Sequence, residues 1–322
     1  MRYSYYPGCS LERNARSYHV SAMAVSKPFN LEFAELDDWN CCGATEYIAL
    51  NKLAAYALIA RNLVIAKNMP GDGHQLVAPC SACYLNLSKT EQYLSENADL
   101  AEKINLALAA GGLHYNPGGL LVRHLLDIFV NDVGYEAIAE KVVNPLKGLR
   151  VAPYYGCMIV RPEFQGTFDD AEQPITLDKL MKTLGATVVD FPLKANCCGG
   201  HMSQISEPVA MDLLHRLIKN AAEYQADIIV TLCPMCQFNL DAFQESVNKY
   251  YKTNFHIPVL YFTQMIGLAL GISAQELGIG KELVDARPAL AKIGVEVPEP
   301  EPVKKKRPSK EELPMPRMPV KE

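Results

Sequence analysis

The sequence predicts an α/β fold of two duplicated domains, each with a small parallel sheet flanked by helices, followed by a disordered C-terminal tail. Three observations lead to this prediction. One cysteine pattern occurs twice in the 322 residues, short β-rich runs alternate with amphipathic segments in both halves, and the last 25 residues are rich in proline and lysine. Because alternating strands and helices are typical of parallel sheets, the two halves are expected to share one architecture.

The first predicted domain covers residues 1–100. β-rich runs at 2–6, 31–36 and 75–78 are its candidate strands, and the apolar spacing of residues 45–67 predicts its clearest helix. In a parallel sheet the loops at the carboxyl ends of the strands gather into one crevice. Cysteines that are distant in the sequence can therefore converge there.

The second predicted domain covers residues 149–297 and repeats the same order. Its candidate strands are 150–155, 187–191 and 227–232, and residues 207–224 have the apolar spacing of a helix. Corresponding cysteines of the two domains lie 148 to 156 residues apart. This separation is one domain length, so the pattern indicates a duplication.

The remaining segments are a connector and a tail. Residues 101–148 are richer in helix than in strand and are predicted to be a helical connector between the domains. Residues 298–322 hold seven of the 21 prolines and the run VKKKRPSK, with few apolar residues to bury. A segment of this composition is predicted to be disordered.

Composition narrows the possible functions. The formal net charge is −5 and no basic stripe is interleaved with aromatic residues, so no nucleic-acid partner is expected. No apolar run reaches the roughly 20 residues of a transmembrane segment, and the N-terminus lacks a secretory signal pattern. We expect a cytoplasmic protein, peripheral to the membrane only through its partners. In that reducing compartment, patterned cysteines bind metal or do redox chemistry.

All ten cysteines belong to the repeated pattern. Each half contains one cysteine, then Cys-Cys-Gly, then Cys-x-x-Cys, with gaps of 31 and 37 residues in the first half and 39 and 34 in the second. The flanking residues also match: Asn-Cys-Cys-Gly occurs at 40–43 and 196–199, and residues 76–87 align with 229–240. An asparagine follows the last cysteine by three residues in both halves. The duplicated pattern is much more specific than a single Cys-x-x-Cys.

This pattern places thiolates where a parallel sheet brings loops together. Each Cys-x-x-Cys lies where a predicted strand gives way to a helix, so free N–H groups of the first helical turn can stabilise thiolate charge. Adjacent cysteine side chains diverge, which suits two metal atoms, and Gly43 and Gly199 supply backbone freedom beside them. Tetrahedral zinc and an ordinary cubane cluster each take four ligands. A fifth cysteine therefore implies a larger or opened cluster, or a spare thiol beside the metal.

Over about residues 2–261 the chain resembles the pair of cysteine-rich CCG domains found in the B subunit of heterodisulfide reductase. The resemblance implies that each domain holds a noncubane [4Fe–4S] cluster through its five cysteines. The implied ligands are Cys9, Cys41, Cys42, Cys80 and Cys83 for the first cluster, and Cys157, Cys197, Cys198, Cys233 and Cys236 for the second. No ligand position departs from the family pattern, so both clusters are expected.

The resemblance also implies a function and partners. The chain would be the catalytic iron–sulfur subunit of a heterodisulfide reductase-like complex, reducing a disulfide, or forming one in reverse, between its two clusters. The substrate would be CoM-S-S-CoB or a related thiol or persulfide of bacterial sulfur metabolism. A small ferredoxin-like iron–sulfur subunit and a flavin-containing subunit would exchange electrons with it. His201, in Cys-Cys-Gly-Gly-His, is a candidate catalytic proton donor to a leaving thiolate.

Two other functions fit the same residues. Similar CCG domains relay electrons in dehydrogenase or quinone-linked complexes without binding a substrate, and a spectral response to added thiols would separate this role from disulfide chemistry. The third function is a zinc-stabilised interaction module. Zinc in both repeats leaves one cysteine per repeat unexplained, whereas zinc in one repeat stays open.

Overall fold

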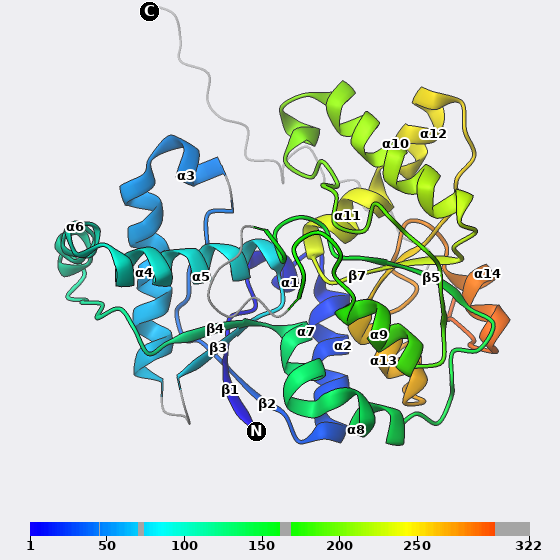
Figure 1. Cartoon of the computed structure of the whole chain (residues 1–322), viewed down its shortest axis with the longest axis horizontal. Coiled ribbons are helices and arrows are strands. Elements are labelled where there is room, and N and C mark those ends of the chain that lie inside the picture. Colours follow the sequence, from blue (N-terminus) through cyan, green and yellow to red (C-terminus); the bar gives the residue numbers. More distant parts are fainter. Residues whose placement is uncertain (45, 70–73, 162–168, 300–322) are drawn as a thin grey trace, which may run out of the picture.

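A computed structural model describes residues 1–44, 46–69, 74–161 and 169–299 (Figure 1). It contains two four-stranded sheets in which every paired strand is parallel, with strand orders β2-β1-β3-β4 and β6-β5-β7-β8. Helices flank both sheets (Figure 1). The two orders are identical when the second set is counted from β5, so the predicted α/β duplication is confirmed.

The first sheet is built from four short strands. They are β1 (Arg2–Tyr5), β2 (Glu32–Glu35), β3 (Gln75–Ala78) and β4 (Leu121–His124). The first three match predicted strands, whereas β4 lies inside the segment for which the sequence predicts a helical connector. Four residues are too few to show a two-residue period clearly, and the polar Arg123 interrupts the apolar run.

The helices of the first half alternate with these strands. They are α1 (Cys9–Glu12), α2 (Arg16–Ser26), η1 (Lys27–Phe29), α3 (Glu46–Leu50), α4 (Lys52–Asn68), α5 (Ser81–Glu96), α6 (Ala98–Ala109), α7 (Leu125–Asp127), η2 (Ile128–Gly134) and α8 (Tyr135–Glu140). The helix predicted over residues 45–67 is therefore two helices. The break falls at Asn51, whose side chain caps α4 by accepting a hydrogen bond from the Ala54 N–H at 3.1 Å.

The second half repeats the plan. Its strands are β5 (Arg150–Tyr154), β6 (Thr187–Val188), β7 (Ile228–Thr231) and β8 (Val259–Tyr261). Its helices are α9 (Thr176–Thr183), η3 (Met202–Gln204), α10 (Glu207–Glu223), α11 (Pro234–Ala242), α12 (Gln244–Tyr251), α13 (Phe262–Ala269), α14 (Arg287–Leu290) and η4 (Ala291–Ile293). The sequence pattern indicates β5, β6, β7 and α10 but not β8, which has only three residues.

Helices α2 and α13 join the two halves, and they lie side by side at the centre of the molecule (Figure 1). The Ser21 and Thr263 hydroxyls are 2.7 Å apart across this interface, and both residues are fully buried. The Tyr18 ring stacks on Tyr261 with 4.2 Å between centroids, and its hydroxyl donates to the Leu232 carbonyl at 3.2 Å. These contacts fix one sheet against the other, which decides how the two cysteine sets meet.

Part of the predicted organisation falls outside what the structure describes. The predicted disordered tail, 298–322, lies outside the described residues from position 300 onward. The boundaries 1–100, 101–148 and 149–297 stay predictions. The segment 101–148 nevertheless contributes β4 to the first sheet, where Ala78 pairs with His124.

Candidate iron–sulfur site

The cysteines lie where the strands end. In the first half, Cys9 opens α1 after β1, the Cys41-Cys42 pair follows β2, and Cys80 stands at the N-cap position of α5 after β3. The Sγ atoms of Cys9 and Cys41 are 3.7 Å apart, and those of Cys42 and Cys83 are 3.5 Å apart. Hydrogen bonds link Cys41 to Cys42 and Cys80 to Cys83. The five thiols therefore form one row, in the order 9, 41, 42, 83 and 80.

The second half contains the corresponding row. Hydrogen bonds link Cys157 to Cys197, Cys197 to Cys198, Cys198 to Cys236, and Cys236 to Cys233. The order is again first cysteine, cysteine pair, then the two members of Cys-x-x-Cys in reverse. Since this order follows from matching loops on matching strands, the duplication extends to the geometry of the sulfur atoms.

The two rows meet in the interior. The Cys80 and Cys233 thiols hydrogen-bond to each other, and this contact is the largest cause of the raised pKa of Cys80. Both side chains are buried, at 6% and 3% exposure. At the outer ends of the rows, Cys9, Cys41 and Cys197 are exposed and Cys157 is half-buried. The sulfur atoms thus run from one surface position through the core to another.

This arrangement differs from a single-ion site. Among the described residues, no group of three or more Cys, His, Asp or Glu side chains is placed to hold one metal ion. A set of five linked thiols suits a centre with several metal atoms better than a tetrahedral ion. The ten cysteines are brought together as two sets, and their role as ligands stays a proposal.

Within each pair of adjacent cysteines, hydrogen bonds give the two thiols different pKa values. The Cys42 and Cys9 thiols, with the Gly43 N–H, lower the pKa of Cys41 to about 2. Hydrogen bonding to that thiolate is the main cause that raises the pKa of Cys42 to about 11.

The second repeat shows the same division. Cys157 and Cys198 lower the pKa of Cys197 to about 2, helped by the Gly199 N–H at 3.3 Å. The pKa of Cys198 is raised to about 12, chiefly by its hydrogen bond to Cys197. The first cysteine of each pair therefore carries negative charge at neutral pH, the form in which a thiol binds metal.

Matched tyrosines hold the two Cys-Cys-Gly loops. The Tyr6 hydroxyl donates to the Asn40 carbonyl at 2.8 Å, and the Tyr154 hydroxyl donates to the Asn196 carbonyl at 2.7 Å. Both rings are fully buried. Their fixed position three residues before the first cysteine of each repeat is the available signal of a further role.

Matched asparagines hold the same loops from the other side. Asn86 on α5 donates to the Cys42 carbonyl at 3.2 Å, and Asn239 on α11 donates to the Cys198 carbonyl at 2.6 Å. Both side chains are buried, at 3% and 2% exposure. The asparagine that follows each Cys-x-x-Cys in the sequence thus ties two cysteine motifs of one repeat together.

Glycines leave room beside the sulfur atoms. A Cβ atom on Gly8 would lie 2.9 Å from Cys83 Sγ, and one on Gly156 would lie 2.9 Å from Cys236 Sγ. Both glycines also have positive φ, at +74° and +71°. A side chain at either position would therefore fill the space beside a thiol that a metal centre requires.

Replacing Gly156 with alanine is expected to lower both stability and the iron content of the second site. The strained φ alone costs about 1–2 kcal/mol, and the new methyl group pushes against Cys236. Urea unfolding and iron analysis of anaerobically prepared protein measure the two effects. Gly294→Ala is the matched control, because Gly294 has φ +70° and open space around its Cβ position. It should lose stability only. Equal iron in both variants would contradict the assigned role of Gly156.

The two outer ends of the rows have different surroundings. A hollow of about 560 Å³ reaches Cys9 and Cys41, and its other lining residues are Glu12, Glu35, Leu36, Asp37, Asp38 and Trp39. The Trp39 indole N–H donates to Glu35 Oε1 at 3.1 Å, and its ring packs edge-on against Tyr6. In the second repeat, His201 lies close enough to Cys197 for its charge to help lower the pKa of that thiol. His201 is thus near the second row, while its role as proton donor stays a proposal.

Comparisons with known proteins agree with the duplicated geometry. The family model CCG, described as a cysteine-rich domain, matches residues 3–88 and 151–241. A protein named 8-methylmenaquinol:fumarate reductase membrane anchor subunit, from Wolinella succinogenes, is 36% identical over 88% of this chain and 97% of its own length. The B subunit of the ferredoxin/F(420)H(2)-dependent CoB-CoM heterodisulfide reductase of Methanosarcina acetivorans is 30% identical over 90% of this chain and 96% of its own.

A third relative and one solved structure extend the comparison. The B subunit of the ferredoxin:CoB-CoM heterodisulfide reductase of Methanosarcina mazei is 28% identical over 90% of this chain and 96% of its own. A hypothetical protein from Helicobacter pylori has the same fold at a TM-score of 0.69, with 16% identity over 88% of this chain and 52% of that one. Within the described part of this chain, no helix has the length and apolar character needed to cross a membrane.

Proposed function

The chain belongs to the family of CCG cysteine-rich domain proteins, and on this premise we propose that it is an iron–sulfur subunit of a multi-subunit reductase, carrying electrons between partner subunits through two [4Fe–4S] clusters. One observation carries the proposal. The ten thiols form a row that crosses from one repeat to the other through the buried contact of Cys80 with Cys233. Two redox centres held by this row would exchange electrons through the protein interior, away from solvent.

The residues present fit such centres. Each repeat offers five thiols, a glycine beside the last of them, and N–H groups that face the first cysteine of a motif. When bound, each cluster would supply one-electron redox chemistry at a potential set by hydrogen bonds and exposure. The chain itself would hold the thiolates, keep water from the inner cysteines and fix the two sets at one separation. The ligands would be the ten cysteines named above, with noncubane clusters accounting for the fifth thiol.

The surroundings of the outer cysteines favour electron relay over disulfide reduction. Four carboxylates line the hollow beside Cys9 and Cys41, and these would repel an anionic thiol or disulfide. The same carboxylates would attract a partner protein with a basic surface. The relative at 36% identity carries the name of a quinol:fumarate reductase subunit, which agrees with a place in a dehydrogenase or quinone-linked complex.

Disulfide reduction is the second candidate, favoured by a different observation. Cys197 is exposed and lies near His201, so a sulfur substrate could reach the second site with a proton donor beside it. Two relatives are named as heterodisulfide reductase subunits. In this function the substrate would be CoM-S-S-CoB or a related thiol or persulfide. In both functions a ferredoxin-like iron–sulfur subunit and a flavin-containing subunit are the proposed partners.

Anaerobic spectroscopy separates these candidates. The full chain is purified without oxygen, its iron and zinc are measured, and electron paramagnetic resonance spectra are recorded before and after adding thiols and disulfides. For a relay we expect about eight irons per chain, as two four-iron centres give, and spectra that thiols leave unchanged. A thiol-induced change that is lost in His201→Gln would favour disulfide chemistry over relay. Iron-free protein would contradict both functions, and bound zinc would support the interaction module.

A further inference from the structure

His124 stands at the carboxyl end of β4, at the same edge of the first sheet as the cysteines. It pairs with Ala78 on β3, two residues before Cys80. The corresponding pair in the second sheet is Thr231 with Tyr261. His124 and Tyr261 are therefore equivalent positions on the two outer strands. Neither strand is indicated by the sequence pattern, so this pairing becomes visible only in the structure.

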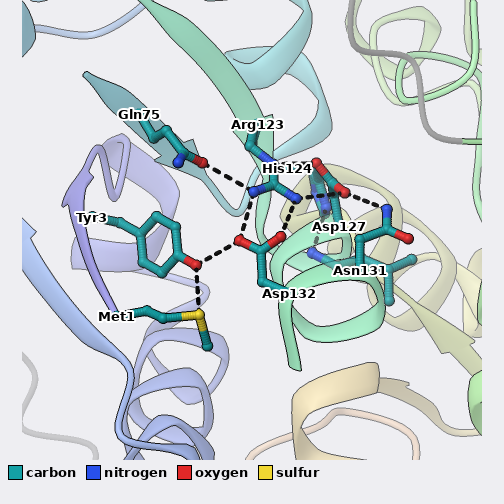
Figure 2. Close-up of polar contacts among 9 residues, drawn as sticks. Met1, Tyr3, Gln75, Arg123, His124, Asp127, Asn131 and Asp132 are labelled. Carbon is teal, nitrogen blue, oxygen red and sulfur yellow. Dashed lines mark hydrogen bonds and ion pairs between the residues drawn. The ribbon is translucent and has the colours of Figure 1, made fainter. Parts of the chain in front are cut away.

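The ring of His124 is fixed in one orientation. Its Nδ1 atom accepts a hydrogen bond from the Leu126 N–H at 3.1 Å, so in the neutral ring the proton is assigned to Nε2. The ring also contacts Tyr84 edge-on, with 5.9 Å between centroids. On the neighbouring residue, Arg123 makes ion pairs with Asp127 and Asp132 that hold the end of β4 (Figure 2). Nε2 is thus a positioned donor.

This donor has no acceptor in the described structure. His124 is fully buried, and Nε2 makes no hydrogen bond. The Pro79 and Leu232 carbonyls lie near the ring, but neither accepts from Nε2 in hydrogen-bond geometry. Buried N–H groups without a partner are rare and costly, so an acceptor is expected at this place.

The surroundings point to sulfur as the missing acceptor, because Leu232, whose carbonyl lies near the ring, directly precedes Cys233. The negative charge of Cys233 acts on the His124 ring and raises its pKa, although burial is the larger effect and lowers that pKa to about 4. Two hydroxyl oxygens near the cysteine junction are also buried without a partner, Ser81 Oγ and Thr231 Oγ1. Ser81 follows Cys80 directly, and Thr231 precedes Cys233 by two residues. Several donors therefore gather around the contact between the two rows.

Resting on the proposed clusters, we propose that His124 of the first repeat donates a hydrogen bond from Nε2 to the Cys233 sulfur of the second repeat when that sulfur is bound to iron. Tyr261, the equivalent residue of the second repeat, already donates its hydroxyl hydrogen bond to Gln237 at 3.2 Å. The donor is thus contributed across the repeat boundary and to one site only. Hydrogen bonds to cluster sulfurs stabilise the reduced, more negative state, so His124 is a positioning residue that raises the potential of the second site.

The first test compares redox potentials. His124→Leu removes the donor, whereas His124→Gln keeps an N–H group near the position of Nε2. Redox titrations of the full chain are followed by electron paramagnetic resonance. At a fixed potential, His124→Leu should lower the reduced-to-oxidised ratio of the second site about tenfold, because a hydrogen bond to a charged group is lost. For a one-electron centre this equals a shift of about 59 mV. His124→Gln should recover most of the shift.

The control is His215→Leu. His215 lies on α10, and its ring stacks on Tyr251 with 3.9 Å between the ring centroids. No cysteine is among the groups that shift the pKa of His215, so replacing it should leave both redox potentials unchanged. The shifted signal should be the one that disappears in Cys198→Ala. A wild-type potential in His124→Leu protein with full iron content would overturn the proposal while leaving the proposed function intact.

A second measurement covers the case in which His124→Leu does not fold. Pulsed electron paramagnetic resonance on protein labelled with ¹⁵N-histidine should detect a nitrogen coupled to the second site. The measurement is made in the His201→Gln background, because His201 also lies near that site. A coupling supports the proposal, and its absence from iron-loaded protein overturns it. Iron-free wild-type protein would overturn the proposed function and this inference together.

Discussion

Replacing Arg123 with methionine is expected to lower the free energy of unfolding by about 3–5 kcal/mol, because the buried carboxylate of Asp127 and the half-buried carboxylate of Asp132 lose their counter-charge. The guanidinium group bonds Asp127 at 2.6 and 2.9 Å and Asp132 at 2.6 and 2.9 Å, and it donates to Gln75 at 3.0 Å. All five of its N–H donors are therefore used. The side chains of Arg123 and Asp127 are only 11% and 6% exposed.

The position of this network explains the size of the expected effect. Arg123 lies on β4, Asp127 and Asp132 lie on the helical turns that follow, and the Tyr3 hydroxyl on β1 donates to Asp132 at 2.5 Å (Figure 2). One side chain thus ties the outer strand to the next helix and to the centre of the sheet. Lysine supplies the charge but not the planar fork, so Arg123→Lys should lose part of the same stability.

Urea unfolding of the variants measures this prediction. Arg2→Met is the control, since the exposed ion pair of Arg2 with Glu32 at 3.3 Å should contribute no more than about 1 kcal/mol. Adding Asp127→Asn and Asp132→Asn to Arg123→Met should restore part of the loss, because the uncompensated charges are then removed. A change below about 1 kcal/mol in Arg123→Met would contradict a structural role for the network.

Local patterns in the sequence are enough to locate the cysteines on the fold. The apolar runs before Cys9 and Cys80 predict strands β1 and β3, and parallel strands must end at a common edge. The first-turn N–H groups of α11 do face Cys233, as the position of Cys-x-x-Cys at a strand-to-helix junction suggests. These inferences depend on residues close in sequence, for which periodicity and motif spacing carry the information.

The features that the sequence does not reveal depend on distant residues. Strands β4 and β8 are short, and they are held by pairing with β3 and β7 more than by their own pattern. The contact of Cys80 with Cys233 depends on how α2 packs on α13, which brings Tyr18 onto Tyr261. No local pattern encodes such packing. Sequence reasoning misses His124 for the same reason, because its importance comes from a strand that the sequence pattern does not indicate.

Replacing Cys42 or Cys198 with alanine is expected to remove one cluster each, and so to lower the iron content from about eight to about four irons per chain. Cys42 links the outer pair of its row to Cys83, with 3.5 Å between the sulfur atoms, and it is 3% exposed. Cys198 holds the same place through its hydrogen bond to Cys236 and is 5% exposed. Each loss should stay within its own repeat, because the rows meet in the described part of the chain through Cys80 and Cys233, and neither replaced residue takes part in that contact.

Iron, zinc and acid-labile sulfide analysis, with spectra of the reduced protein, measures the result. Thr90→Val is the control, since Thr90 is fully buried on α5 and its hydroxyl has no hydrogen-bond partner in the described structure. It should keep all of the iron. If one repeat held zinc, one variant would lose zinc and leave the iron unchanged. If a single cysteine replacement removed the metal from both repeats, the two rows would form one site, and the assignment of one cluster to each repeat would be wrong. Independent losses in the two variants would instead show that the duplicated rows assemble their centres separately, as their matched loops predict.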